Sequence, residues 1–453
     1  MKTIVAISTA PMTSAIGIVR ISGDRAFEIT EKIFSKPLAN VDGYRVVYGK
    51  IYDGKKILDT VLATVFRAPN SYTGEDTVEL SCHGSPYILN RVVELLIENG
   101  AVRAGRGEFS KMAYINGKMD AVQAEGVIDL IEAQTAAEVA AAQSELGGKI
   151  SEKVEEVRKK LVSLSADILA YVDYPDEDIA DISSEKIEKT VSECYEQINT
   201  LSLTYGKGRM IKNGVRTVIC GKPNAGKSML MNSILGCERS IVTETEGTTR
   251  DVVEETVNLG DVVLRLADTA GIRDTDNPVE KIGVARAREA LEQAELILAV
   301  FDASRPLGQE DQGVFSLLAD RTERVIAVLN KTDCGQDADT VRALRAHFPV
   351  CIPVSAARGD GMEALVQCVQ ARFLDGNLDI SQDAVIANAR QHAALTRCRQ
   401  ALEQAIRAID DGLPTDLYCT DAEYAMQAVA EVDSRTVSED VVSAIFSHFC
   451  VGK

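Results

Sequence analysis

The sequence predicts a multidomain protein in which an α/β domain precedes a helical domain, and a second α/β domain is inserted into the helical one. Three stretches that differ in composition and hydrophobic pattern predict this fold class. Residues 1–118 mix short β-like runs with Gly, Pro and Asn punctuation. Residues 119–213 are rich in Ala, Glu and Lys, with apolar residues at three- and four-residue spacing, and the helical pattern resumes in residues 376–453. Between them, residues 214–375 alternate strand-like and helix-like segments, as parallel α/β domains do.

Hydrophobic patterning justifies the individual elements. In the first domain, IGIVRIS, ILDTVLATVF and TVELSC are typical of strands, and PYILNRVVELLIENG is the one helix we expect. In the helical domain we expect long helices over residues 121–146, 151–172 and 384–409, and Pro175 ends the helical run after the second. In the inserted domain we expect strands at VRTVIC, VVLRLA, VIAVL and CIPV.

Composition limits the classes of protein that fit. The 453 residues are 45% hydrophobic and 26% charged, which argues against wholesale disorder. No run of about 18 apolar residues occurs and the N-terminus lacks a signal-peptide pattern, so we expect no membrane span. Ten cysteines without a C-x-x-C pair indicate reduced thiols in a cytoplasmic protein, and His83 beside Cys82 has no third ligand at metal-site spacing.

The charge balance bears on possible partners. The formal net charge of −19 argues against broad electrostatic binding of nucleic acid. The absence of Trp argues against a stacking platform for single strands. Neither observation excludes a local basic patch, or a nucleic acid that is delivered by a partner protein.

Residues 221–228, GKPNAGKS, have the G-x-x-x-x-G-K-S pattern of a phosphate-binding loop. They follow the strand expected at Val215–Cys220 and open an expected helix, which is the context that this loop requires. The glycines let backbone N–H groups face phosphates, and the helix N-terminus adds positive potential. We expect Lys227 to reach the β- and γ-phosphates and Ser228 to bind Mg²⁺. The alternative is a strand–turn–helix whose glycines occur by chance.

Two downstream loops are candidates for contacts with Mg²⁺ and the γ-phosphate. Asp268 of DTAG ends the run VVLRLA, which matches a carboxylate near Mg²⁺ at the C-terminal end of a strand. Between this strand and the phosphate-binding loop lies EGTTRD, where Thr248 and Thr249 could supply a hydroxyl and backbone contacts. Alone, a Gly-Thr-Thr loop is also ordinary turn chemistry.

The identity of the base is predicted from NKTD, residues 330–333, which follow the run VIAVL. The carboxylate of Asp333 can accept both N1–H and N2–H of guanine, whereas adenine offers no such pair of donors. SAARGDG follows CIPV and would place Ser355 and Ala356 near the base. Four elements in this order favour a GTP-binding domain over an ATPase or a degenerate fold.

The predicted GTP contacts come from all of these loops. They are Asn224, Ala225, Gly226, Lys227, Ser228, Met229, Thr243, Glu244, Thr245, Glu246, Gly247, Thr248, Thr249, Asp268, Thr269, Ala270, Gly271, Asn330, Lys331, Thr332, Asp333, Ser355, Ala356 and Ala357, of which Ser228 and Thr249 are the predicted Mg²⁺ ligands. Ile272 follows DTAG, where Ras-like switches have a glutamine that orients the attacking water. Ile272 has no side-chain hydrogen-bonding group, so two alternatives remain. Either GTP is hydrolysed poorly, or the water is held from elsewhere.

Motifs along almost the whole chain resemble one protein family. They are VRISG, VELSCHG, GEFSKMAYINGKMDAVQAEGVIDLI, GKPNAGKSMLMNSILG, EGTTRDVVEE, DTAGIRDTDNPVEKIG and the terminal IFSHFCVGK. These motifs are similar to those of the MnmE (TrmE) family of tRNA-modification GTPases, in the Era-like group of TRAFAC GTPases. The resemblance implies a folate-binding and dimerisation domain at 1–118, a helical domain at 119–213 and 376–453, and a Ras-like P-loop GTPase domain inserted at 214–375.

The resemblance also implies an activity, cofactors and partners. Members form homodimers and, with an MnmG-type FAD protein, modify C5 of the wobble uridine of certain tRNAs. An aminomethyl or carboxymethylaminomethyl group is added with a one-carbon unit from a folate such as 5-formyltetrahydrofolate. GTP hydrolysis in the family is activated by K⁺ and depends on dimerisation of the GTPase domains. The residues implied are Arg20, Glu79, Lys118 and Lys453 for folate, Asn224, Thr243, Thr245 and Thr248 for K⁺, and Glu280 for the catalytic water.

Most of these residues also have an ordinary structural explanation. The charged side chains assigned to folate are otherwise explained as solvated surface charges. Glu280 is otherwise a carboxylate that stabilises a helix N-terminus. Arg250 and Arg273 are rival donors of positive charge, or form salt bridges within switch loops. Cys450 is expected to be a structural thiol, because His448 two residues away would face elsewhere on a helix.

Two functions from different classes therefore follow. The leading hypothesis is a K⁺-activated, dimerisation-dependent GTPase that acts in wobble-uridine modification. The alternative is a non-catalytic, GTP-regulated assembly factor of the Era-like kind. The acidic net charge leaves room for this alternative.

Overall fold

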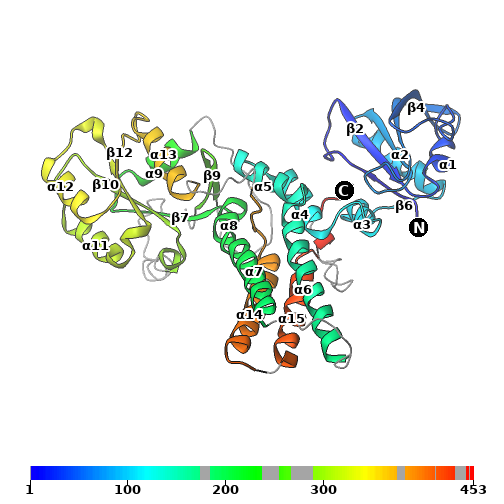
Figure 1. Ribbon diagram of the computed structural model, residues 1–453. Coiled ribbons are helices and arrows are strands. Elements are labelled where there is room, and N and C mark those ends of the chain that lie inside the picture. Colours follow the sequence, from blue (N-terminus) through cyan, green and yellow to red (C-terminus); the bar gives the residue numbers. More distant parts are fainter. Residues whose placement is uncertain are drawn as a thin grey trace. The chain divides into compact units, whose positions relative to one another are not determined.

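The structure is a computed structural model, and the described residues form two compact units. The described residues are 2–173, 184–236, 255–266, 289–374, 383–413, 415–433, 445–447 and 449–452. One unit comprises Met1–Ile128, Leu146–Tyr195 and Arg397–Lys453, and the other comprises Asp129–Glu145 and Glu196–Thr396. In the described part of the chain each unit contains a six-stranded sheet (Figure 1).

The first sheet forms the N-terminal α/β domain. Its strand order is β3-β4-β5-β2-β1-β6, and all neighbours are antiparallel except the parallel pair β1 and β6. The strands are β1 (Ile4–Ile7), β2 (Ile16–Ser22), β3 (Arg45–Asp53), β4 (Lys56–Phe66), β5 (Thr77–His83) and β6 (Val102–Arg103). The strands expected at IGIVRIS, ILDTVLATVF and TVELSC are therefore confirmed.

One face of this sheet carries the core of the domain. Helices α1 (Ala26–Glu31) and α2 (Pro86–Glu98) pack on the sheet, and α2 contacts β1, β2 and β5 (Figure 1). Because side chains alternate along a strand, buried residues of β2 and β5 face the helices and the residues between them face away. Arg20 and Glu79 are such residues, and they are directly paired in register.

The prediction of a single helix in this domain was incomplete. Besides α2, the structure forms α1 and α3 (Glu108–Ile115). These helices have 6 and 8 residues, which is too short for a clear helical period in the sequence.

Long helices follow the first sheet and return after the second. They are α4 (Ala121–Glu132), α5 (Ala136–Leu146), α6 (Lys149–Asp173), α7 (Ser184–Leu203), α8 (Tyr205–Asn213), α14 (Ala389–Asp410) and α15 (Thr415–Ala430). Helix α6 packs on α15 and buries an apolar stripe that includes Val154, Leu161 and Ile168. No described helix is long and apolar enough to cross a membrane.

The single helix expected over residues 121–146 is divided into α4 and α5. Thr135 Oγ1 accepts a hydrogen bond from the N–H of Glu138 at 3.2 Å, and the Glu138 carboxylate accepts from the N–H of Thr135 at 3.1 Å. This capping box satisfies N–H groups at the start of α5. The T-x-x-E signal was present in the sequence, but the Ala-rich pattern continues through it.

Helix α14 begins five residues later than the sequence predicts. The preceding residues 384–387 are buried in a non-helical conformation. The N–H of Ile386 donates to Thr204 Oγ1 at 3.0 Å, and a Cβ on Gly208 would lie 2.2 Å from Ile386 O. Tertiary contacts with the start of α8 therefore override the local helical pattern.

The second sheet has the order β12-β11-β10-β7-β9-β8, parallel except for the antiparallel pair β8 and β9. Its strands are β7 (Val215–Cys220), β8 (Glu255–Leu259), β9 (Val262–Leu266), β10 (Leu296–Asp302), β11 (Val325–Asn330) and β12 (Cys351–Pro353). The accompanying helices are α9 (Lys227–Leu235), α11 (Gln309–Leu318), η2 (Ala319–Arg324), η3 (Thr332–Cys334), α12 (Ala338–His347) and α13 (Met362–Phe373).

Both faces of the second sheet are buried, which explains its uninterrupted apolar strands. Along β10, Leu296, Leu298 and Val300 join the core under α9 and α13, whereas Ile297 and Phe301 join the core on the other face with α12. In such a sheet the loops at the carboxyl ends of the strands form the ligand site. The predicted fold class, with α/β and helical parts in this order along the chain, is confirmed.

Candidate nucleotide-binding site

The phosphate-binding loop joins β7 to α9, and its shape requires its glycines. Gly221 has φ +148° and Gly226 has φ +99°, in the region that L side chains rarely adopt. A Cβ on Gly221 would lie 2.4 Å from Val300 O, and a Cβ on Gly226 would lie 2.2 Å from Asn330 Nδ2. Asn224 has φ +62°, which asparagine tolerates better than most residues.

The ammonium of Lys227 is held over this loop. Lys227 is the first residue of α9, and its Nζ donates to Gly221 O at 3.1 Å and to Lys222 O at 2.9 Å. Ser228 follows on the same helical turn. The N–H groups of this first turn have no acceptors within the helix and carry the positive end of its dipole. The loop therefore combines a cation and backbone donors in the arrangement that binds phosphate.

Asn330 connects the phosphate-binding loop to the loop after β12. This side chain ends β11 and is only 1% exposed. Its Nδ2 donates to Ala225 O at 3.0 Å, and its Oδ1 accepts from the N–H of Ala356 at 3.0 Å. Asn330 therefore contributes to the site by fixing two loops.

Lys331 and Asp333 give the base end of the site its charges. Lys331 Nζ donates to Asn224 O at 2.8 Å. Asp333 Oδ1 accepts from Ser355 Oγ at 2.7 Å, and this hydrogen bond lowers the pKa of the Asp333 carboxyl below its ordinary value. Asp333 is therefore an anionic acceptor at neutral pH, as recognition of guanine N–H groups requires.

Asp302, at the end of β10, is a site residue that the sequence analysis missed. Its Oδ2 lies 2.9 Å from Lys331 Nζ, and its Oδ1 accepts from Ser304 Oγ at 2.6 Å. Burial alone would raise the pKa of Asp302, but the hydrogen bonds from Ser304 and Lys331 outweigh burial and lower it. The signal in the sequence was a carboxylate at the end of the apolar run LILAVF.

These loops enclose a cavity of about 450 Å³, a size typical of small-molecule sites. Its lining residues are Asn224, Gly226, Lys227, Ser228, Met229, Asn330, Lys331, Asp333, Cys334 and Ala357. The structure thus brings the predicted phosphate and base contacts to one place. Ala225, Thr332, Ser355 and Ala356 lie in the same loops and support these residues. Cys334 was not predicted, although it directly follows NKTD.

The other predicted nucleotide contacts lie outside the described residues. They are Thr243, Glu244, Thr245, Glu246, Gly247, Thr248, Thr249, Asp268, Thr269, Ala270 and Gly271, together with Glu280. Ser228 and Asn224, the described candidates for Mg²⁺ and K⁺, line the cavity and offer hydroxyl and amide oxygens, which suit hard cations. Among the described residues, no group of three or more His, Cys, Asp or Glu could hold a metal.

Three of the predicted folate residues are described, and two of them are in contact. Arg20 Nε and Nη2 each lie 2.8 Å from Glu79 Oε1, and Arg20 Nη1 donates to Gly452 O at 3.3 Å. The Arg20 guanidinium also lies 5.5 Å from the ring centroid of Tyr72 and 5.6 Å from that of Phe109. Arg20, Glu79 and the penultimate residue of the chain therefore form one cluster.

Lys118, the third described folate candidate, has a different partner. Its Nζ donates to Pro69 O at 3.1 Å. It also lines a cavity of about 550 Å³ with Asp120 and Asp433. Lys453 lies outside the described residues.

The histidine and thiol candidates outside the nucleotide site have structural surroundings. His83 Nδ1 lies 2.6 Å from Asp59 Oδ1. Burial raises the pKa of the Cys82 thiol to about 12, which keeps it protonated and unreactive at neutral pH. Cys450 is exposed, and its neighbour His448 lies outside the described residues.

Comparison with known proteins decides the family. Residues 3–118 match the family described as GTP-binding protein TrmE N-terminus, and residues 122–450 match the MnmE helical domain. The chain is 40% identical over 459 residues to the tRNA modification GTPase MnmE of Thermoanaerobacter pseudethanolicus, covering 100% of this chain and 99% of that relative. This chain belongs to the MnmE family.

Other MnmE proteins match over the same length. The tRNA modification GTPase MnmE of Clostridioides difficile is 39% identical over 456 residues, and that of Geobacillus thermodenitrificans is 39% identical over 460 residues. In both cases 100% of this chain and 99% of the relative are covered. Membership of the MnmE family confirms the predicted family and the predicted enzyme class, a GTPase.

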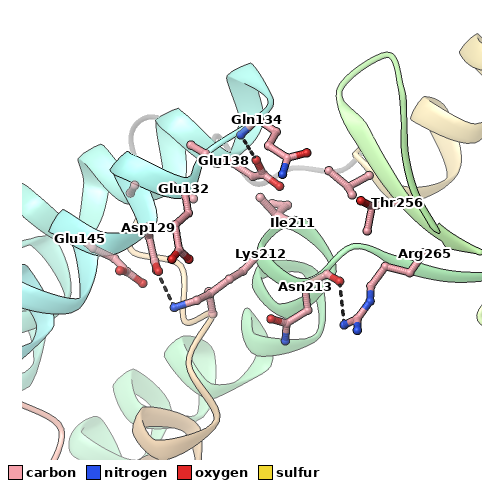
Figure 2. A pocket seen from close by; sticks show the side chains of 15 residues that line it. Asp129, Glu132, Gln134, Glu138, Glu145, Ile211, Lys212, Asn213, Thr256 and Arg265 are labelled. Carbon is pink, nitrogen blue, oxygen red and sulfur yellow. Dashed lines mark hydrogen bonds and ion pairs between the residues drawn. The ribbon is translucent and has the colours of Figure 1, made fainter. Parts of the chain in front are cut away.

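This MnmE-family chain has a further cavity, of about 390 Å³, which the sequence did not indicate (Figure 2). Its walls come from α4, α5, α8, β8 and β9. Lys212 Nζ lies 2.6 Å from Asp129 Oδ2, and Arg265 Nη1 donates to Asn213 O at 3.4 Å. These contacts fix the end of α8 to α4 and to β9, immediately before the strand that leads to the phosphate-binding loop. Figure 2 shows the carboxylate of Glu132 pointing toward the same space.

Proposed function

We propose that this chain hydrolyses GTP to drive modification of C5 of the wobble uridine in certain tRNAs. It would act in the cytoplasm with an MnmG-type FAD protein and a one-carbon unit from 5-formyltetrahydrofolate or a related folate. The observation that supports GTP binding and hydrolysis is that Lys227 and Asp333 line the same cavity. The tRNA part is supported by family membership, since the full-length relatives are tRNA modification GTPases.

The same proposal divides the chain into three domains. Residues 1–118 would bind folate and dimerise, residues 119–213 with 376–453 would form the helical domain, and residues 214–375 would form the GTPase domain. Element bounds support this division, because strand β6 ends at Arg103 and the second sheet begins at Val215.

In this proposal the chain's own residues bind and orient GTP. The N–H groups of the phosphate-binding loop face the β-phosphate, and Lys227 exchanges the carbonyl oxygens of Gly221 and Lys222 for phosphate oxygens. The Ser228 hydroxyl would hold Mg²⁺. Bound Mg²⁺ and K⁺ would supply positive charge that offsets the charge developing on the phosphates. Water adds to the γ-phosphorus as the bond to the β–γ bridging oxygen breaks, which releases GDP and phosphate.

Asn224 and Glu280 have the two roles that Ile272 cannot fill. Asn224, which lines the cavity, would hold K⁺ with oxygens of Thr243, Thr245 and Thr248. Glu280 would orient the attacking water when the GTPase domains pair.

GTP turnover in different salts tests this arrangement. We expect faster hydrolysis in KCl than in NaCl at equal ionic strength, and equal rates would remove K⁺ from the proposal. Glu280→Ala should lower turnover while GTP affinity stays nearly unchanged. Glu310→Ala, an exposed carboxylate on α11, is the matched control and should turn over like the parent. An unaltered rate in Glu280→Ala would return Glu280 to a capping role.

The Arg20 cluster supports the folate part of the proposal. Close to the rings of Tyr72 and Phe109 and paired with Glu79, the guanidinium is held in one orientation on the face of the sheet that points away from α1 and α2. Glu79 can accept from the amino-pyrimidine edge of a pterin, and Arg20, Lys118 and Lys453 can meet carboxylates. Titration with 5-formyltetrahydrofolate should show binding that Arg20→Ala abolishes. Arg25→Ala, which removes an exposed pair with Glu28, should bind like the parent.

An exposed apolar face supports the proposed homodimer. Strand β3 lies at the edge of the first sheet, and Val46, Tyr48 and Leu62 on β3 and β4 are 57%, 63% and 45% exposed. Tyr48 and Leu62 are paired across the two strands, so they share one face. A second copy of the chain that covers this face would remove the apolar surface from water.

Sedimentation of the full chain tests the homodimer. Tyr48→Lys should sediment as a monomer, while Tyr424→Lys, which alters an equally exposed side chain on α15, should remain dimeric. A dimeric Tyr48→Lys protein would place the interface elsewhere.

Mass spectrometry of wobble nucleosides distinguishes this proposal from the alternative of a non-catalytic assembly factor. Cells that lack the chain should lose the C5 modification, the parent chain should restore it, and Lys227→Ala should not. A normal nucleoside profile in the deletion strain would favour the assembly factor, for which the net charge of −19 leaves room.

A further inference from the structure

A buried ion pair connects the phosphate-binding loop to helix α11. Lys222, the second residue of the loop, points away from the cavity, and its Nζ lies 2.5 Å from Asp311 Oδ2. The side chains of Lys222 and Asp311 are 8% and 1% exposed. None of the loop motif's fixed positions requires a charge at residue 222, so the motif does not account for this pair.

The pair is anchored at its acidic end. Asp311 is in the first turn of α11, and its Oδ2 also accepts from the N–H of Gly308 at 2.8 Å. Its Oδ1 is buried and has no hydrogen-bond partner among the described residues. The carboxylate therefore depends on Lys222 to balance its charge, and Lys222 depends on Asp311 in the same way.

At its basic end, the ion pair is connected through the backbone of Lys222 to Lys227, the predicted phosphate-binding residue. The carbonyl oxygen of Lys222 accepts from Lys227 Nζ at 2.9 Å and from the N–H of Ala225 at 3.3 Å. Asp311 therefore holds the Lys222 side chain, and the Lys222 peptide holds Lys227. Displacement of the Lys222 peptide would move the resting place of the Lys227 ammonium and the N–H groups next to it.

Global stability is a poor explanation for such a pair. Buried ion pairs can often be replaced by apolar side chains of similar volume with little loss of stability, because desolvation offsets their attraction. What an apolar pair cannot reproduce is the fixed direction of a charged hydrogen bond.

We propose that Lys222 and Asp311 are positioning residues for nucleotide binding. Their ion pair fixes the backbone of the phosphate-binding loop in the geometry that Lys227 and the loop N–H groups need. The effect should appear in affinity for GDP and GTP, because the loop geometry is required in both complexes.

Titration calorimetry of GDP binding to the full chain tests this proposal. Lys222→Met and Asp311→Asn should each raise the Kd for GDP about tenfold or more, which corresponds to a loss of about 1.4 kcal/mol or more in binding free energy. Lys222→Arg keeps the charge and a donor but is larger, so it should bind GDP more tightly than Lys222→Met. Arg342→Met, which removes an ion pair on the exposed side of α12, is the control and should bind like the parent.

The double variant Lys222→Met/Asp311→Asn separates positioning from stability, because the amide oxygen can still accept from the N–H of Gly308. It removes both buried charges, so its melting midpoint should return close to that of the parent while its Kd for GDP stays raised. A double variant that recovers both quantities would overturn the proposal, and so would a folded Lys222→Met protein that binds GDP as tightly as the parent. If Lys222→Met does not fold, the Kd of the double variant decides.

Discussion

Replacement of Asn330 by Ala tests how the two halves of the nucleotide site are held together. The variant loses the hydrogen bonds to Ala225 O and from the N–H of Ala356, both 3.0 Å long and buried. Each bond contributes about 1 kcal/mol net, and each partner left buried without a bond costs about 1–3 kcal/mol. The two quantities partly describe the same loss at each contact and are therefore not added in full. For the two contacts together we expect a loss of about 3 kcal/mol.

If all of that loss appears in nucleotide binding, the Kd for GDP rises by about a hundredfold, since 1.4 kcal/mol is a factor of about ten. Calorimetry on the full chain measures the Kd, and far-UV circular dichroism checks folding because the chain has no Trp for fluorescence. Asn330→Asp keeps the acceptor for Ala356 but faces Ala225 O with an oxygen, so it should also bind weakly. Asn90→Ala, an exposed change on α2, is the control. If folded Asn330→Ala binds GDP with a Kd within about twofold of the parent's, the Asn330 side chain is not needed to fix the two loops for nucleotide binding.

Two further predictions concern titration and thiol reactivity. The hydrogen bond from Ser355 lowers the pKa of the Asp333 carboxyl. GTP binding that needs the ionised carboxylate therefore persists below the ordinary carboxyl pKa. It is lost as the pH falls through the lowered pKa. Ser355→Ala should therefore move the acid limb of the GTP-affinity profile to higher pH, and an unmoved limb would remove this explanation. In the folded chain, iodoacetamide should modify the exposed Cys334 and Cys450 before Cys398, because burial raises the pKa of the Cys398 thiol. Peptide mass spectrometry measures the order of labelling. Equally fast labelling of Cys398 would contradict its burial.

Strands were predictable where their signals are local, whereas β1, β3, β6, β8 and β10 were not predicted. Alternating or continuous apolar runs gave β2, β4, β5, β7, β9 and β11 nearly to the residue. The division between α4 and α5 depends on a cap, and the late start of α14 depends on a contact with Thr204. Such features compete with a strong local helical pattern, and only the folded structure shows which one prevails.

The same distinction applies to the nucleotide site. The described residues of the contiguous motifs line one cavity, because each motif fixes its own loop between a strand and a helix. Residues that act across loops were missed: Lys222 and Asp311 are 89 positions apart, and Asp302 is 29 positions from its partner Lys331. Their pairing requires the strand order of the second sheet, which no single motif specifies.

Asp302 and Asp311 lie at the two ends of one short segment, and each holds a different end of the cavity. Asp302 pairs with Lys331 of the NKTD motif, whereas Asp311 pairs with Lys222 of the phosphate-binding loop. Asp302→Asn should weaken GDP only a few-fold, because Lys331 is one-third exposed and keeps its bond to Asn224 O.

The two variants should differ further with guanosine, which lacks phosphates. Asp302→Asn should weaken guanosine and GDP by similar factors, measured by competition calorimetry, whereas Lys222→Met should weaken GDP alone. Equal losses for both ligands in Lys222→Met would mean that the ion pair supports the whole domain and not the phosphate end. The comparison therefore separates a local positioning role from general support of the fold, using two ligands that differ only in the group that the loop holds.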